Sequence, residues 1–160
     1  TRTGYSKRKY INPDNYGIQN YDWTNFIYIR YAEVLLTYAE ARNENLSAPD
    51  AKVYDAVNQI RQRVNLPGLE EGLSKDQMRD AIRLERRLEL AFEGIHLFDT
   101  RSYRTTEKDV TKPVYGIDPD GKKILIETRK FNPNRDYLWA IPLKEIDLSQ
   151  GVLKQNPEWD

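Results

Sequence analysis

The segment from Tyr28 to Asn43 constrains the fold more than any other, because its apolar residues recur with the period of an α-helix. These residues fall in two rows, Ile29, Ala32, Leu36 and Ala39 in one and Tyr31, Leu35 and Tyr38 in the other. The polar residues form a single stripe, made of Arg30, Glu33, Thr37 and Glu40. A helix with so wide an apolar face must be covered on most sides, so the sequence predicts that Tyr28, Tyr31 and Tyr38 are core residues.

Two more helices are predicted from their start signals and apolar spacing. The second covers Asp50 to Val64. Its start is predicted from Ser47-Ala48-Pro49-Asp50, a Ser-x-x-Asp capping pattern with proline in the first turn. The third covers Lys75 to Glu93 and is preceded by a capping box of Ser74 and Gln77. Its predicted core row is Met78, Ala81, Leu84, Leu88 and Ala91.

The rest of the chain carries weaker signals. A short fourth helix is predicted from His96 to about Tyr103. Asp118-Pro119-Asp120-Gly121 is a turn signal between two apolar runs, which predicts a β-hairpin within an excursion spanning about residues 105–135. The tail from Tyr137 to Asp160 is punctuated by proline and is predicted to be extended, with a short helix beginning at Pro142.

The predicted fold is therefore mainly α, with tetratricopeptide-like helix pairs, a minor β-hairpin and irregular segments, in one domain over residues 1–160. The first 25 residues are predicted to be irregular, apart from a short strand near Lys9-Tyr10-Ile11. Consecutive helix pairs with short connections are typical of tetratricopeptide-like stacking. An isolated pair buries its faces poorly, and the chain begins Thr1-Arg2-Thr3-Gly4 without Met or a signal peptide. We therefore expect a piece of a longer protein, with more repeats upstream.

Composition excludes several classes of function. Lys plus Arg and Asp plus Glu both number 25, so the formal net charge is zero, which argues against nucleic acid or anionic lipid as the main partner. The chain has no cysteine and one histidine, which excludes thiol nucleophiles and His-rich metal sites. No run approaches the roughly 20 apolar residues of a membrane span. We expect no cofactor, no metal and no transmembrane segment.

Four segments, in the same order along nearly the whole chain, resemble the SusD/RagB family. They are Gly4-Tyr5 with Arg8-Lys9-Tyr10, Ile29-Arg30-Tyr31-Ala32-Glu33-Val34-Leu35-Leu36 with Tyr38-Ala39-Glu40-Ala41, Glu85-Arg86-Arg87-Leu88-Glu89-Leu90-Ala91-Phe92-Glu93-Gly94 with Phe98-Asp99, and Tyr137-Leu138, Ile141-Pro142, Glu145-Ile146 and Gln155-Asn156-Pro157. The chain departs from the family pattern at His96, Tyr103, Ala140 and Glu158-Trp159. These departures concern packing and peripheral loops.

The resemblance implies a surface lipoprotein of the Gram-negative outer membrane, of which this chain would be the C-terminal part. Such proteins have a tetratricopeptide-like scaffold and bind oligosaccharides or polysaccharides without cleaving them. They sit over a SusC-like TonB-dependent transporter in polysaccharide utilisation, and a lipid anchor is then expected on the part that precedes this sequence. The alternative is a helical-repeat scaffold for protein–protein interaction, with no direct glycan site in this segment. An enzyme is a distant third.

Glu85, Glu89 and Glu93 are four residues apart, so they lie along one helix face with neighbouring carboxyls roughly 5–6 Å apart. This separation resembles that of a retaining glycosidase. Hydrolytic carboxylates, however, flank a bond from opposite sides of a cleft, and a row on one convex helix does not. We therefore predict a structural ion network and no catalytic residue. The predicted network consists of Glu85, Arg86, Arg87, Glu89, Glu93 and Asp99.

Candidate ligand contacts are loop aromatics, because apolar sugar faces stack on exposed Trp and Tyr rings while Asn and Asp bind hydroxyl groups. The segment before the first helix supplies this mixture in Tyr16, Asn20, Tyr21, Asp22 and Trp23. Tyr103 and Tyr115 are further candidates. Asp118, Asp120 and Gly121 are predicted to form a turn rather than a calcium loop, since the later Glu of such a loop is missing.

Overall fold

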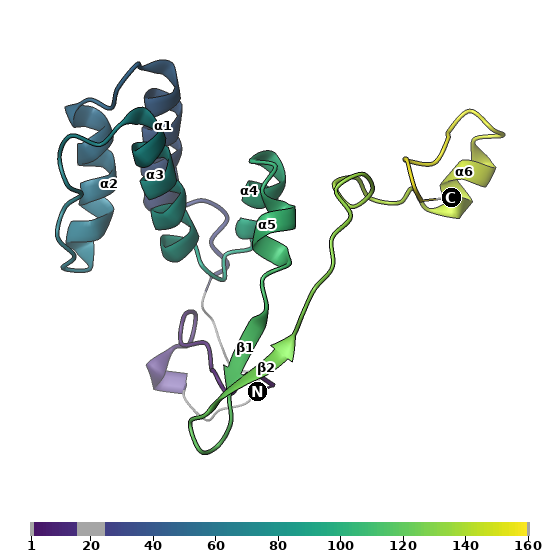
Figure 1. The fold of residues 1–160 in the computed structure, drawn as a ribbon, viewed down its shortest axis with the longest axis horizontal. Helices are drawn as coiled ribbons and strands as arrows, with labels where there is room; N and C mark the ends of the chain where they lie inside the picture. Colours follow the sequence, from purple (N-terminus) through teal and green to yellow (C-terminus); the bar gives the residue numbers. More distant parts are fainter. Residues whose placement is uncertain (1, 16–24, 160) are drawn as a thin grey trace. The chain divides into compact units, whose positions relative to one another are not determined.

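The computed structural model describes residues 2–15 and 25–159, and it is mostly helical with one small antiparallel sheet. The chain divides into two compact units, which we call the helical unit (Lys9–His96) and the hairpin unit (Thr1–Arg8 with Leu97–Asp160). Figure 1 shows the three longest helices in the helical unit and the strands in the hairpin unit. The predicted fold class, mainly α with a minor β-hairpin, is confirmed.

The helical unit contains α1 (Tyr31–Asn45), α2 (Ala51–Arg63) and α3 (Lys75–Glu89), preceded by the 3-10 turn η1 (Pro13–Asn15). The first residues of α1 lie beside the last turns of α2, and Arg42 near the end of α1 pairs with the helix-capping Asp50. The first two helices are therefore antiparallel, as predicted, and this arrangement is consistent with a tetratricopeptide-like fold.

Polar side chains fix where α2 and α3 begin. Asp50 caps α2 by accepting a hydrogen bond from the N–H of Val53 at 3.2 Å, so the N-cap is this residue and not Ser47. Ser74 and Gln77 form the predicted capping box on α3. The Gln77 N–H donates to Ser74 Oγ at 3.2 Å, and the Ser74 N–H donates to Gln77 Oε1 at 2.8 Å.

The core of the helical unit lies between its three helices. It consists of Ala32, Leu36, Ala39, Val53, Ala56, Val57, Ile60, Met78, Ile82 and Leu90. Asn43 is also fully buried, and its side-chain amide donates to the backbone carbonyl of Lys75 at 3.0 Å. This hydrogen bond ties the end of α1 to the start of α3.

Only one of the two predicted apolar rows of α1 is buried. The buried row is that of Ala32, Leu36 and Ala39. Tyr28 is 85% exposed, Tyr31 68% and Tyr38 43%, so the prediction that they are core residues is wrong. The reason is that α2 and α3 cover a single arc of α1, the arc that carries Ala32, Leu36, Ala39 and Asn43.

Two further predictions of local structure are wrong. α3 ends at Glu89, four residues before the predicted end. Its buried residues are Met78, Ile82, Glu85 and Arg86, whereas Leu84 and Leu88 of the predicted core row are exposed. Lys9-Tyr10-Ile11 is not a strand, because Tyr10 has a φ of 65° in a turn. The ammonium group of Lys9 holds that turn by donating to the carbonyls of Glu89 and Ala91, each at 2.9 Å.

The hairpin unit contains α4 (His96–Ser102), α5 (Thr106–Val110), β1 (Val114–Ile117), β2 (Lys123–Glu127) and α6 (Leu143–Leu148). The strands are antiparallel, and Tyr115 lies opposite Leu125. The predicted turn between them is confirmed, with the Asp118 carboxylate accepting from the N–H groups of Asp120 and Lys122 at 3.0 and 2.8 Å. The sequence predicted α4 and α6, while α5 carries no strong start signal and was missed.

Segments distant in sequence also meet within the hairpin unit. The N–H of Ile117 donates to the carbonyl of Thr3 at 2.9 Å, so the start of the chain extends the edge of β1. A Cβ on Gly116 would lie 2.6 Å from that carbonyl oxygen, which excludes any other residue without displacement. In the tail, the amide of Gln155 bonds both backbone groups of Ile141, at 2.8 and 2.9 Å.

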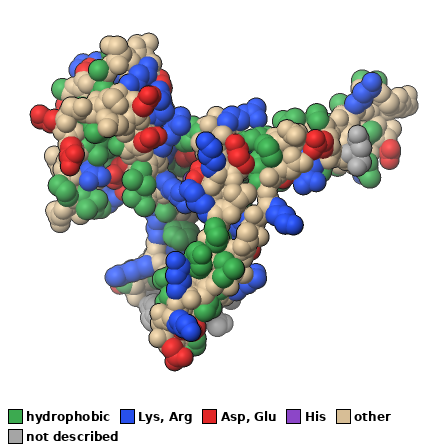
Figure 2. All heavy atoms as spheres, viewed as in Figure 1, with side chains coloured by type: hydrophobic (Ala, Val, Ile, Leu, Met, Phe, Trp, Pro, Cys, Tyr) green, Lys and Arg blue, Asp and Glu red, His purple; other side chains and the backbone are tan. Residues whose placement is uncertain are grey.

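Charged side chains of both signs are interspersed over the visible face of the helical unit, with hydrophobic groups exposed among them (Figure 2). Within the described ranges, no helix is both long and apolar enough to cross a membrane.

Replacing Leu36 by Ala should destabilise the protein by about 2–4 kcal/mol, because Leu36 is fully buried and the change leaves a cavity among three helices. Leu84→Ala is the matched control, since Leu84 is exposed and its loss should cost less than about 1 kcal/mol. Urea unfolding followed by circular dichroism measures both. Equal losses for the two variants would contradict the observed packing of α1.

Candidate functional site

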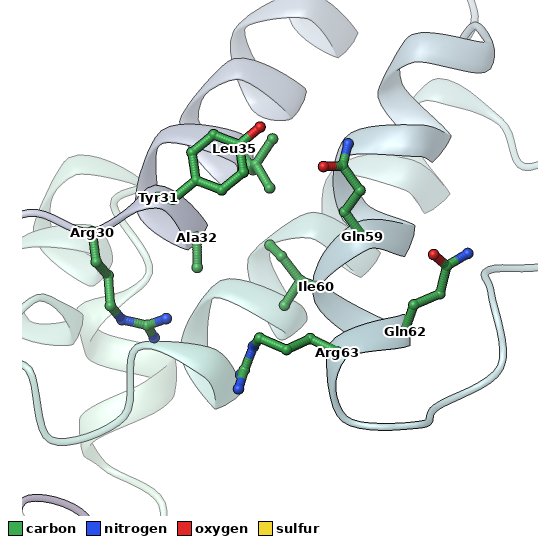
Figure 3. A pocket seen from close by; sticks show the side chains of 8 residues that line it. All are labelled: Arg30, Tyr31, Ala32, Leu35, Gln59, Ile60, Gln62 and Arg63. Carbon is green, nitrogen blue, oxygen red and sulfur yellow. The ribbon is translucent and has the colours of Figure 1, made fainter.

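A pocket of about 490 Å³ opens between the start of α1 and the end of α2 (Figure 3). It is lined by Arg30, Tyr31, Ala32, Leu35, Gln59, Ile60, Gln62 and Arg63. The buried side chains of Ala32 and Ile60 supply an apolar base. Exposed Tyr31 and the two glutamine amides supply an aromatic ring and hydrogen-bonding groups around it. The pocket thus combines the groups that bind the apolar face and the hydroxyls of a sugar ring.

The local sequence explains why the pocket is open at this end of the helix pair. Arg30 is extended, with φ −133° and ψ 161°, and α1 begins only after it. α2 ends at Arg63, and the chain turns away through Asn65 with a φ of 58°. Gln59 and Gln62 are three residues apart, so they share one face of α2.

Arg30 anchors the start of α1 to the C-terminal end of α3. Its Nε donates to the two carboxylate oxygens of Glu93 at 2.9 and 3.1 Å. Its Nη1 donates to a carboxylate oxygen of Glu89 at 2.5 Å, and its Nη2 donates to the Glu89 backbone carbonyl at 2.7 Å. One guanidinium group therefore satisfies two buried carboxylates and one helix-end carbonyl.

Lys9 and Arg63 complete this cluster, which we call the Glu89–Glu93 network. Lys9 pairs with the carboxylate of Glu93. Arg63 Nη2 donates to both carboxylate oxygens of Glu89 at 2.8 Å, so the ends of α1, α2 and α3 meet at one carboxylate. The network consists of Lys9, Arg30, Arg63, Glu89 and Glu93.

The network shifts the pKa values of its members. Burial alone would raise the pKa of Glu93, but the hydrogen bonds from Arg30 and Lys9 outweigh it and hold this pKa below its usual value. The hydrogen bond to Glu93 in turn raises the pKa of Arg30 above its usual range. Both groups are therefore charged at neutral pH.

The glutamates at four-residue spacing meet cations that come from other elements. Glu85 pairs with Arg61 of α2 at 2.8 Å, and Glu89 and Glu93 pair within the network described above. Arg86 reaches α1, with Glu33 at 3.5 Å and Thr37 Oγ1 at 3.3 Å. Arg87 is exposed on α3, and Asp99 is half-buried in α4 of the hairpin unit.

This arrangement of carboxylates does not favour acid–base catalysis. Each glutamate of the row is hydrogen-bonded to an arginine, and the three lie along a single stretch of chain. Among the described residues, no three His, Asp or Glu side chains gather as a metal site.

The sequence-predicted ligand residues are not brought together in the described structure. Tyr16, Asn20, Tyr21, Asp22 and Trp23 lie outside the described residues. Tyr103 follows α4 and is half-buried, and its N–H donates to the Asp99 carbonyl at 2.9 Å. Tyr115 is exposed on β1, and Lys123 Nζ lies 3.9 Å from its ring centroid, so one ring face is covered.

The pocket residues Tyr31, Gln59, Gln62 and Arg63 were missed from the sequence. Tyr31 was assigned to the core because of its helical spacing. The sequence offers one signal for this pocket: Gln59, Gln62 and Arg63 are polar residues at the end of α2, next to the first turn of the antiparallel α1. The signal is weak, because the sequence does not show which side of α1 is covered by other helices.

Antiparallel helix pairs are the building unit of helical-repeat proteins, which bind their ligands on the surfaces that the stacked pairs form. The comparisons with known proteins make the class specific. The family model described as "SusD family" matches residues 1–159. The chain belongs to the SusD family, which confirms the resemblance seen in its sequence.

Curated relatives include two proteins of Formosa agariphila. "SusD-like protein P2" is 36% identical over 141 residues, covering 84% of this chain and 26% of the relative. "SusD-like protein P38" is 39% identical over 108 residues, covering 62% of this chain and 21% of the relative. The chain thus spans about a quarter of the length of these relatives.

Solved structures agree with the fold. A SusD-like protein from Bacteroides fragilis matches with a TM-score of 0.84 and 37% identity, over 99% of this chain and 31% of that chain. A SusD homolog from Bacteroides thetaiotaomicron matches with a TM-score of 0.65 and 27% identity, over 89% of this chain and 30% of that chain.

Replacing Glu93 by Gln should destabilise the protein at pH 7 by about 1–3 kcal/mol, because Arg30 and Lys9 lose their shared carboxylate. The pKa of Glu93 is lowered in the folded state, so its contribution is full above the usual value of 4.5 and disappears as the pH falls through the lowered value. The difference between wild type and variant should therefore shrink below pH 4.5.

Denaturant unfolding across pH 3–8 measures this difference. Glu71→Gln, at an exposed position, is the control and should change stability little at any pH. An E93Q variant as stable as the wild type at pH 7 would mean that the network is only a solvated surface.

Proposed function

We propose that this protein captures oligosaccharides or polysaccharides at the cell surface without cleaving them, and delivers them to a SusC-like TonB-dependent transporter of the outer membrane. Membership of the SusD family over nearly the whole chain carries the proposal. The pocket between α1 and α2 supports it, because an exposed tyrosine ring beside two side-chain amides suits a sugar.

A non-enzymatic role agrees with the chemistry of the site. The carboxylates paired with the pocket arginines are those of Glu89 and Glu93, whose side chains are only 9% and 4% exposed. Both are committed to arginine or lysine partners, and neither lines the pocket. A carboxylate pair that flanks a glycosidic bond is therefore not provided by this site.

A helical-repeat scaffold that binds a protein is the alternative function. Leu84, Leu88 and Phe92 favour it, because they are exposed at four-residue spacing on and just after α3. The two functions differ in what the pocket residues do. A scaffold without a glycan site would show no loss of sugar binding when the pocket is altered.

Replacing Tyr31 by Ala should weaken glycan binding by about 1–3 kcal/mol, the scale of a lost aromatic contact. Tyr38→Ala is the matched control, since Tyr38 is exposed two turns further along α1 and does not line the pocket. Isothermal titration calorimetry with the best ligand from a glycan array measures both variants. Unchanged affinity in Y31A would remove this pocket from the site.

The segment that carries Tyr21 and Trp23 remains a second proposed contact. Trp23→Ala or Tyr21→Ala should weaken binding of the same ligand by about 1–3 kcal/mol, because one of these rings is proposed to stack on the sugar. Titration of both variants tests this, and unchanged affinity in both would exclude the segment. Release of reducing sugar by the wild-type protein would instead contradict the non-enzymatic role.

A further inference from the structure

The lining of the pocket is one-sided in charge. Among the described residues that line it are two guanidinium groups, those of Arg30 and Arg63, and no carboxylate. The two groups lie close together because both bind the carboxylate of Glu89 (Figure 3). Any ligand in the pocket therefore meets positive charge at this end.

The carboxylates behind the lining do not cancel this charge. Counted over the part of the chain that the structure describes, the Glu89–Glu93 network contains three cations and two carboxylates, so these five side chains carry one excess positive charge. The carboxylates are buried, whereas the side chain of Arg63 is 58% exposed. The excess charge is thus presented toward solvent and not toward the core.

Only one nitrogen atom of the Arg63 guanidinium group donates hydrogen bonds to described residues. Within the described part of the chain its recorded hydrogen bonds are the two from Nη2 to Glu89. A guanidinium group has five N–H donors in one plane, each able to donate to an oxygen of a carboxylate or sulfate. Glu89 holds the group at the edge of the pocket through Nη2, and the donors on Nε and Nη1 remain for a ligand.

We infer that this pocket selects oligosaccharides bearing an anionic substituent, a uronate carboxylate or a sulfate ester, through the guanidinium group of Arg63. The inference rests on the proposed function and narrows its substrate class. In this arrangement the sugar ring lies against Tyr31 and the apolar base, its hydroxyls face Gln59 and Gln62, and its anionic group faces Arg63. The family resemblance and the pocket's shape do not require this charge preference, so it is tested separately.

The test uses matched pairs of ligands that differ only in charge. Oligogalacturonate is compared with its methyl ester, and a sulfated carrageenan oligosaccharide with its desulfated form, by titration calorimetry of the full chain. The wild type should bind the charged member of one pair about tenfold more tightly. The pair that shows the preference distinguishes a carboxylate from a sulfate, and the preference should fall as salt is raised.

Arg63→Gln should reduce the preference to within about twofold, because only the charged member loses an ion pair with the guanidinium group. Lys52→Gln is the matched control, because it removes one exposed charge from the same helix, outside the pocket, and it should keep the preference. Arg63→Lys, which keeps the charge and loses the planar set of donors, should keep part of the preference. Thermal melts show whether each variant is folded, which we expect because Arg30 is a second partner of Glu89.

Equal affinity for both members of each pair, or a preference that survives Arg63→Gln, would overturn the inference. If neutral ligands bind and Tyr31→Ala weakens them, the proposed function stands and only the charge selection fails. If the wild type binds neither member of any pair, nor any neutral or acidic polysaccharide on a glycan array, both fail.

Discussion

The carboxylate of Glu89 joins the ends of the three helices of the helical unit. It lies at the last residue of α3, is nearly buried, and receives hydrogen bonds from Arg30 before α1 and from Arg63 at the end of α2. A buried carboxylate with one partner removed is costly, since a lone charge then remains in a poorly solvated place. Glu89 therefore favours the register in which the ends of the three helices bring arginines to this group.

The opposite end of the bundle is held in a different way. Asn43 is fully buried and donates to the carbonyl of Lys75, and Arg79 of α3 pairs with Glu44 next to it. α1 is thus fixed to α3 at both ends, with apolar side chains packed between. Because the two anchors are polar and directional, they specify the register of the helices, while the aliphatic core supplies the free energy of burial.

Local chemistry made much of this fold predictable. The Ser74–Gln77 box and the apolar spacing of α1 and α3 identify the helices, because capping and periodicity depend on residues a few positions apart. The partners in the Glu89–Glu93 network are far apart in the sequence. Arg30 and Glu89 are 59 residues apart and Arg63 and Glu89 are 26 apart, so no short motif predicts either pair.

The same limit explains the errors at the candidate site. Tyr31 has the spacing of a core residue, and only the position of α2 and α3 around α1 decides that it faces outward. The row Glu85, Glu89 and Glu93 was recognised as structural from its geometry on one helix. Its predicted cations, Arg86 and Arg87, are neighbours in sequence, whereas the structure brings Arg30, Arg61 and Arg63 from elsewhere in the chain.

Stability and ligand selection share residues in this site. Arg30 binds Glu89 and Glu93 with all three nitrogen atoms of its guanidinium group, so its charge mainly stabilises the fold. Arg63 contributes less to stability, because Glu89 also has Arg30 as a partner. Side chains at position 63 can therefore vary the charge of the pocket at a smaller cost to the bundle than those at position 30. Changes in ligand preference within such a scaffold are then expected at the end of α2, where the network meets solvent.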